Sequence, residues 1–258
     1  QVGACPAAPG QRRCGGAAAE VEEDPPHGGA SLLQRMASGR SAAKVGSGAD
    51  APQAHAAAGQ AAGQAEWWWQ CPRVHTQPGF NLTAYMGTWY AQEQMPTAYL
   101  PESANNCVSA TYRLLTRPTF PWRYTVGIRN LAVEDDGRVR DSGDLLAAYQ
   151  RCPLDAAKLA VAPKFLPRFL AGDYWVLAFN EAKGYALVSG GQPTIKTPDG
   201  CKTGGGVNQA GLWIFTRQQQ RNEAIVLEVR AKAKEQGFDL TVLNKVDQTN
   251  CKAIPPTQ

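Results

Sequence analysis

The sequence predicts an all-β fold: an eight-stranded antiparallel up-and-down β-barrel with one C-terminal α-helix and a disordered N-terminal tail. Three observations predict it. Strand-like runs separated by turn residues recur every 8–12 residues or so, as in small barrels. Gly87-x-Trp89 opens the first run, where a glycine permits close backbone approach and a large aromatic side chain can close one end of a barrel. A single helical pattern follows the eighth run.

The first 66 residues differ in composition from the rest of the chain. Ala and Gly make up close to half of residues 1–66, and aromatic residues are absent. Such a segment buries too little apolar surface to offset its ordering entropy, so it predicts a disordered tail or a processed leader. The folded domain is expected over 67–258. Trp67-Trp68-Trp69 at its start either packs over that domain or forms an exposed patch for a membrane or partner.

The expected strands are bounded by turn signals and prolines. Glu134-Asp135-Asp136-Gly137 and Glu181-Ala182-Lys183-Gly184 are typical of hairpin turns. Prolines lie between the runs, because a proline inside a strand would remove a ladder hydrogen bond. The stretch 191–206 predicts a surface loop. The expected strands are 88–95, 106–115, 122–131, 138–149, 157–161, 173–180, 184–190 and 211–216.

The expected helix follows Asn222. Asn222-Glu223 supplies a polar start with an acidic residue in the first turn, and Gly237 is typical of the residue just past a helix end. One more strand is expected over 238–243. The apolar stripe of the helix comprises Ile225, Val226, Val229 and Ala233.

The charge, hydropathy and cysteine spacing of the chain argue against several classes of function. The 258 residues carry a net charge of +4 without a dense Lys/Arg run, so no nucleic-acid partner is expected. No stretch approaches the roughly 18 apolar residues of a membrane-spanning helix. The seven cysteines are widely spaced, without a Cys-x-x-Cys pair, and the three histidines lie outside the strand-like region. This pattern indicates long-range disulfides in an oxidising compartment rather than a metal site.

Asn81-Leu82-Thr83 is the one Asn-x-Ser/Thr sequon of the chain. Glycosylation at Asn81 is expected only if the chain enters a secretory route.

Three segments together resemble the lipocalin family, most closely its apolipoprotein D-like group. The first is Gly87-Thr88-Trp89-Tyr90. The second pairs 174–180 with Tyr185-Ala186-Leu187-Val188, although Ala178-Phe179-Asn180 stands where the family usually has Thr-Asp-Tyr. The third is Leu212-Trp213-Ile214-Phe215-Thr216-Arg217, just before the helix. The resemblance covers 71–251 and implies a barrel that binds a small hydrophobic molecule.

The resemblance also implies how one end of the barrel is closed. Arg217 would lie over the indole of Trp89 in a cation–π contact worth roughly 0.5–2 kcal/mol. Gly87, Trp89 and Arg217 would then form the barrel floor, which is a structural role rather than a catalytic one.

Two disulfides follow from the same resemblance, Cys107–Cys251 and Cys71–Cys201. Cys152 could compete for Cys201. Cys5 and Cys14 could pair with each other or stay free.

Side-chain alternation along the strands assigns the lining of the barrel. If Trp89 points inward, so do Glu93 and Met95. Glu93 either receives a ligand hydroxyl or amine, or reaches the rim and water, because an unpaired carboxylate in an apolar cavity is costly. The loop 96–105 would lie over the open mouth. The ligand-binding candidates are Glu93, Met95, Val108, Tyr112, Val126, Tyr174 and Trp213, the last also through the resemblance.

These features favour a non-enzymatic carrier or scavenger of a fatty acid, sterol, retinoid, carotenoid or bilin, with no metal or cofactor. The protein is expected to be a monomer or dimer, secreted or in an organelle lumen such as a plastid. Peripheral membrane contact and protection of membranes against lipid oxidation are compatible with this reading. The alternative is a lipocalin-like enzyme acting on a lipid or xanthophyll, for which Cys107 would be the candidate thiol.

Overall fold

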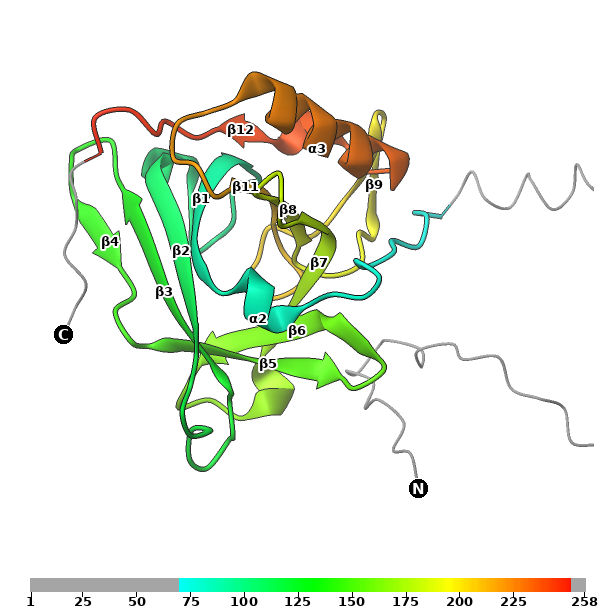
Figure 1. The fold of residues 1–258 in the computed structure, drawn as a ribbon. Coiled ribbons are helices and arrows are strands. Elements are labelled where there is room, and N and C mark those ends of the chain that lie inside the picture. The colour runs from blue at the N-terminus through cyan, green and yellow to red at the C-terminus, as the bar shows by residue number, and fades with distance from the viewer. Residues whose placement is uncertain (1–69, 252–258) are drawn as a thin grey trace, which may run out of the picture.

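The computed structural model describes residues 70–251, and all of their strands except β9 and β10 belong to one sheet (Figure 1). The expected tail, residues 1–66, and Trp67-Trp68-Trp69 lie outside the described residues, as do residues 252–258. Among the described residues, neither helix is long and apolar enough to cross a membrane.

Eight antiparallel strands close into a barrel, because β11 pairs with β1 at the end of the strand order. This confirms the predicted fold class. The barrel strands are β1 (Gly87–Gln94), β2 (Asn106–Leu114), β3 (Val126–Val133), β5 (Leu146–Cys152), β6 (Asp155–Pro163), β7 (Gly172–Asn180), β8 (Tyr185–Ser189) and β11 (Leu212–Thr216).

One expected strand, 138–149, is divided in two. β4 (Val139–Asp141) pairs with β3, and a turn separates it from β5. The turn forms because the carboxylate of Asp141 accepts a hydrogen bond from the Gly143 amide at 2.7 Å, and Gly143 has a positive φ of 55°. Local side-chain capping therefore interrupts the strand pattern.

Two further expectations are corrected. Residues 238–243 are not a strand: Leu240–Val242 form a 3₁₀ helix. The Asp239 carboxylate accepts from both the amide and the hydroxyl of Thr241, which holds the chain in a turn. The stretch 191–206 contains a hairpin of its own, β9 (Ile195–Thr197) with β10 (Gly200–Lys202).

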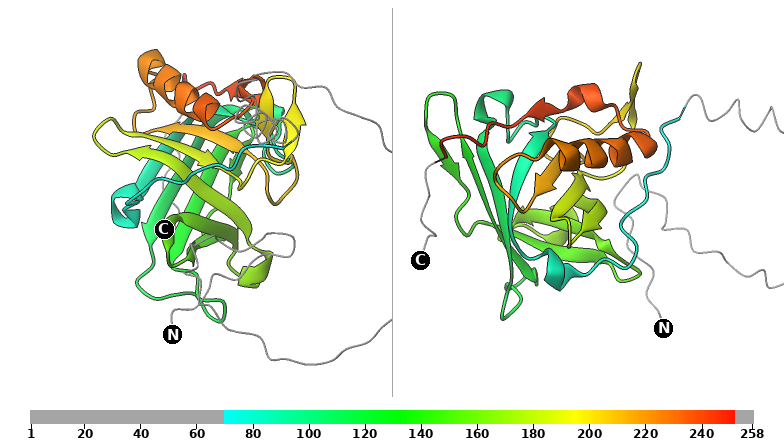
Figure 2. Two further views of the ribbon diagram at one scale, coloured as in Figure 1. Left: turned by 90° about the vertical axis from the view of Figure 1, so that its right-hand side faces the viewer. Right: turned by 45° about the horizontal axis from the view of Figure 1, so that its top comes forward.

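Two helices cover the outside and one end of the barrel. α3 (Glu223–Glu235) follows its N-cap residue Asn222, whose side chain accepts from the Ile225 amide, and it lies across the outer face of the barrel (Figure 2). Its buried residues are Val226, Val229 and Ala233, within the predicted stripe. α2 (Leu82–Tyr85) lies at the closed end. β12 (Asn244–Lys245) adds a short edge to β1.

The closed end is built around Arg217 and Trp89. The Arg217 guanidinium carbon lies 3.7 Å from the centroid of the Trp89 ring. Its nitrogens donate to the carbonyls of Thr88 and of Ala84, Tyr85 and Met86, over distances of 2.7–3.1 Å. One cation thus holds the α2 segment against the start of β1.

Gly87 lies where no larger residue fits well. Its φ is 97°, and an added Cβ would lie 3.2 Å from an Arg217 nitrogen. The glycine of the Gly-x-Trp motif therefore leaves room for the guanidinium.

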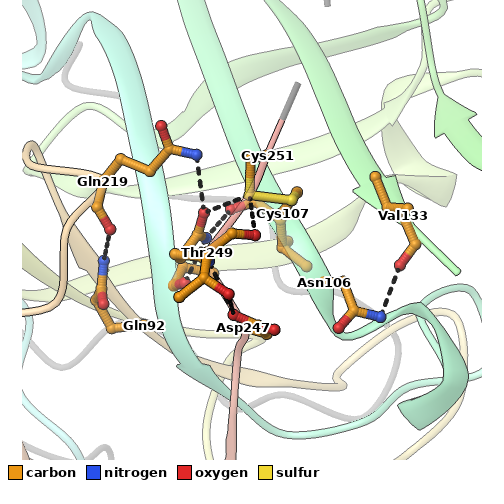
Figure 3. Close-up of a disulfide and its surroundings, with 11 residues drawn as sticks. Gln92, Asn106, Cys107, Val133, Gln219, Asp247, Thr249 and Cys251 are labelled. Carbon is orange, nitrogen blue, oxygen red and sulfur yellow. Dashed lines mark hydrogen bonds between the residues drawn. A yellow bond between two sulfur atoms is a disulfide. The ribbon is translucent and has the colours of Figure 1, made fainter. Parts of the chain in front are cut away.

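Two disulfides join distant parts of the chain, Cys107–Cys251 and Cys71–Cys201. Because Cys201 is bonded to Cys71, the alternative pairing of Cys201 with Cys152 is excluded. Figure 3 shows Cys107 and Cys251 beside Asp247 and Thr249, which form the segment leaving β12. The Cys107 amide donates to the Asp247 carbonyl at 2.7 Å. This segment is therefore fastened to the start of β2.

Trp89→Ala should lower the free energy of unfolding by about 3–5 kcal/mol, because it removes a fully buried aromatic side chain and the partner of Arg217. Chemical denaturation of the variant and the wild type measures this change. Leu227→Ala, at an exposed position of α3, is the matched control and should change the value by less than about 0.5 kcal/mol. Equal stability of the two variants would contradict the floor role.

Candidate functional site

The barrel encloses a cavity of about 880 Å³. Residues of β2 to β7 and of β11 contribute to its wall, which is mainly apolar in its deeper part. Such a volume lies within the roughly 300–1,000 Å³ of pockets that bind small molecules. The apolar wall includes Leu100, Val108, Ala110, Tyr112, Ile128, Leu146, Val161, Tyr174, Trp213 and Phe215.

Four of the seven predicted ligand-binding residues line this cavity: Val108, Tyr112, Tyr174 and Trp213. Val126 is fully buried in the same apolar core but is not part of the cavity wall.

The prediction that Glu93 and Met95 line the cavity is wrong, because neither side chain points into it. A β-bulge between Ala91 and Glu93 places an extra residue, Gln92, in β1 opposite β11. Because alternation has a period of two, one extra residue moves the following side chains to the other face of the sheet. Met95 then packs in the apolar cluster under α3, and Glu93 faces the helix side as well.

Glu93 is paired rather than left for a ligand. One carboxylate oxygen accepts from Arg221 at 2.8 Å, and the other accepts from Arg230 of α3. The Glu93 side chain is only 7% exposed. The buried carboxylate that the sequence singled out thus joins the barrel to its helix.

Three tyrosines form a hydroxyl row at the inner end of the cavity. The Tyr174 hydroxyl lies 2.7 Å from that of Tyr85 and 2.8 Å from that of Tyr112. Burial raises the pKa of each of the three phenols, so the hydroxyls stay neutral. Three hydroxyls carry three protons and the row uses two of them. One O–H therefore remains as a donor within the row.

Trp213 is positioned by a glycine two residues earlier. Gly211 has a φ of 100°, and an added Cβ would lie 2.1 Å from the Trp213 ring. Only a residue without a side chain allows the indole to lie across this position.

The lid expected over 96–105 contributes Tyr99 and Leu100 to the cavity wall. The Ala98 amide donates to the Gly205 carbonyl at 2.8 Å, which joins the lid to the glycine-rich loop before β11. That loop adds Val207, Asn208, Gln209 and Ala210 to the wall.

Sequence reasoning missed the charged part of the wall. Glu134, Arg138 and Arg140 flank the β3–β4 turn, and Glu134 pairs with both arginines. Asp173 of β7 lies 3.1 Å from Arg151 of β5. The Glu134 cluster could have been found from the sequence, because the predicted turn at 134–137 brings its three residues together. The pair of Asp173 with Arg151 depends on how the strands align with one another, so the residues around either position could not predict it.

Two other predicted sites have structural roles. The Asn81 side-chain oxygen caps α2 by accepting from the amides of Thr83 and Ala84, and the residue is exposed. Cys107, the candidate thiol if the protein were an enzyme, is bonded to Cys251 in a disulfide and has no free thiol.

A closed antiparallel barrel with a cavity, an aromatic floor and an outer helix defines a small-molecule-binding barrel of the lipocalin class. No family model matches the chain. Temperature-induced lipocalin-1 of Arabidopsis thaliana is 30% identical over 177 residues, which span 67% of this chain and 81% of the relative. Apolipoprotein D of Bos taurus is 32% identical over 194 residues, 75% of this chain and 90% of the relative.

The chain therefore belongs to the lipocalin family, in its apolipoprotein D-like group. Among solved structures, lobster apocrustacyanin A1 is 16% identical and has a TM-score of 0.47, with 70% of this chain and 92% of that chain covered.

Glu93→Gln should lower the free energy of unfolding by about 2 kcal/mol, because it weakens two charge-assisted hydrogen bonds of a buried carboxylate. Ligand affinity should not change, since Glu93 is not on the cavity wall. Denaturation and ligand titration measure the two quantities. Glu223→Gln is the matched control, because Glu223 pairs with the same Arg221 but is 62% exposed, and it should be nearly neutral. A loss of affinity in Glu93→Gln at unchanged stability would contradict this assignment.

Proposed function

We propose that this protein binds one small hydrophobic molecule inside its barrel, as a carrier or scavenger without a chemical step. The observation that carries the proposal is the 880 Å³ cavity with an apolar inner wall, enclosed by a barrel of a family that binds small hydrophobic ligands. Burial of an apolar ligand against such a wall provides the driving force.

The hydroxyl row favours ligands with one neutral polar end. The inner end of the cavity offers the hydroxyls of Tyr112 and Tyr174, surrounded by apolar side chains, and one of them has a free O–H donor when Tyr85 donates to Tyr174. A ligand carbonyl or hydroxyl would satisfy the remaining donor, whereas a fully apolar end would leave it without a partner. Sterols, retinoids and oxygenated carotenoids have this chemistry, so they are preferred over pure hydrocarbons.

The charged mouth favours a second polar group at the other end of the ligand. Arg138, Arg140 and Asp141 contribute to the wall on the β3–β4 side, where a carboxylate or a second oxygen function would find a partner. A fatty acid would enter with its carboxylate at this mouth. The proposal therefore covers elongated molecules with an apolar body.

The disulfides support a location in an oxidising compartment. Both described disulfides link residues more than 100 positions apart, and such bonds persist in oxidising surroundings. An extracellular or lumenal location agrees with this chemistry.

Titration with a panel of retinol, a sterol, a fatty acid and an oxygenated carotenoid should quench tryptophan fluorescence, because Trp213 lies on the cavity wall. At least one member should bind with a dissociation constant below about 10 μM. Trp213→Phe removes the reporter and should abolish most of the quenching. Failure of the whole panel, checked by native mass spectrometry, would refute the proposal.

Tyr112→Phe should weaken the binding of a ligand with a terminal hydroxyl or carbonyl by roughly tenfold, about the value of one hydrogen bond. Its hydrocarbon analogue should bind the variant and the wild type equally. Affinity should not vary between neutral and mildly alkaline pH, because burial keeps the phenols protonated. Tyr90→Phe, on the adjacent strand β1, is the control. Equal losses for both ligands would show that the hydroxyl row is structural.

A further inference from the structure

The first two barrel strands diverge toward the lid, the loop 96–105. Their pairing runs from Gly87 opposite Tyr112 to Tyr90 opposite Ser109, and it ends there. β1 nevertheless continues to Gln94, and β2 already begins at Asn106. The wall of the barrel is therefore not closed by direct pairing of β1 with β2 in the part next to the lid.

The chain after α3 enters this gap from the β1 side. β12 pairs with Glu93 and Gln94 of β1, and the Val246 amide donates to the Gln92 carbonyl at 3.0 Å. The Val246 side chain is 2% exposed and belongs to the apolar core of the barrel. Up to Val246, the chain is thus attached firmly to β1.

The next residues, 247–251, cross from β1 to β2, and we call them the closing segment. Asp247 forms a bridge with Asn106, and its carbonyl accepts from the Cys107 amide at 2.7 Å. The side-chain amide of Gln248 donates to the carbonyls of Ala91 and Val108, both at 2.8 Å. These two carbonyls belong to the residues that would pair next after Tyr90 and Ser109. The closing segment therefore replaces the missing ladder between the two strands.

The closing segment lies beside the ligand space and also holds the lid. Val108, to which Gln248 donates, lines the cavity. At the end of the lid, the Asn105 carbonyl accepts from the Asp247 amide at 3.0 Å. The Asn105 side chain accepts from the side-chain amide of Gln94 at 2.9 Å. A change in the closing segment would thus reach both the wall and the lid.

The closed arrangement leaves one buried group unsatisfied. Gln94 is 1% exposed, and its Oε1 has no hydrogen-bond donor within the part of the chain that the structure describes. A buried acceptor without a donor costs free energy, which is recovered when water can reach it. Opening at this place is therefore less costly than opening a fully satisfied wall.

The disulfide Cys107–Cys251 anchors the closing segment to β2 (Figure 3). Thr249 and Asn250 are exposed, so little burial holds this end of the segment. Cys107 has a φ of 52° and Asn250 has a φ of 54°. Left-handed conformations are disfavoured for residues that carry a Cβ. Without the disulfide, both residues would gain by leaving them.

We propose that the Cys107–Cys251 disulfide is a redox latch on the cavity, an inference that rests on the proposed ligand binding. A dithiol reductant breaks the S–S bond by exchange: its own two sulfurs form a disulfide, and two electrons and two protons pass to Cys107 and Cys251 as thiols. The closing segment then separates from β2 while Val246 stays in the core. The wall opens beside the lid, and the ligand leaves faster. Oxidising surroundings keep the latch closed.

The other described disulfide is not equivalent, which makes it a matched control. Cys201, bonded to Cys71, lies within β10. Its amide donates to the Gly237 carbonyl and its carbonyl accepts from the Asp239 amide, both at 2.9 Å. These backbone bonds stay when the disulfide is removed, and they lie outside the gap between β1 and β2.

Hydrogen exchange followed by mass spectrometry tests the opening without any ligand, so its outcome is independent of the proposed function. In the full chain treated with dithiothreitol, peptides with the Cys107 and Asp247 amides should exchange roughly tenfold faster or more. Thiol alkylation verifies the reduction. Combined Cys107→Ser and Cys251→Ser should give fast exchange without reductant. Combined Cys71→Ser and Cys201→Ser should exchange slowly until reductant is added.

Stopped-flow tryptophan fluorescence with a ligand that binds measures the release. Release should be roughly tenfold faster or more from the reduced wild type and from the Cys107→Ser, Cys251→Ser variant, and dithiothreitol should not accelerate that variant further. Gln248→Ala keeps the disulfide but removes the bridge between the strands, so it should also release faster. It replaces the serine variant if circular dichroism melting shows that variant to be unfolded.

Two results would overturn the proposal. One is unchanged exchange of the Asp247 peptide after verified reduction. The other is release from the folded serine variant, or from Gln248→Ala in its place, at the rate of the oxidised wild type. Absence of binding by every ligand would refute the proposed function instead, and the exchange experiment would still decide whether reduction opens the wall.

Discussion

The contact between Arg217 and Trp89 determines how the barrel is closed. A guanidinium placed over an indole is stabilised by the ring face, and its donors remain free to bind the carbonyls that end α2. Arg217 follows β11 and Trp89 lies in β1, so this contact joins the last barrel strand to the first at the point where the sheet closes. The sheet cannot open at this seam without exposing the indole and leaving the cation without its partners.

This constraint explains why the glycines beside it are needed. Gly87 and Gly184 both have positive φ values, and an added Cβ at either would lie within 3.2 Å of the Arg217 side chain. The two glycines belong to segments nearly 100 residues apart, yet they make room for the same group. Local sequence could predict the motif, because Gly87 and Trp89 are close along the chain. The shared dependence on Arg217 became visible only with the fold.

The predictions from sequence were right where a few neighbouring residues determine the structure. They were wrong where the register between two strands determines which face of the sheet a side chain occupies. Strand order, the helix after Asn222 and four cavity residues followed from turn signals and alternation. The extra residue Gln92 does not change the polarity pattern of β1, so nothing in the local sequence announced that Glu93 and Met95 would face the helix. Likewise, the hydroxyl row joins Tyr85, Tyr112 and Tyr174, which lie on three different elements, and only the closed barrel brings them together.

The β6–β7 loop lies between the cavity and the solvent. Leu166 and Leu170 of the loop 164–171 contribute to the cavity wall, although Leu170 is itself 47% exposed. Each of them directly follows an exposed phenylalanine, Phe165 or Phe169. A rigid attachment to Trp122 and Tyr124 keeps the two sides of the loop in register with each other. The same short segment therefore forms part of the cavity wall while its phenylalanines remain in solvent.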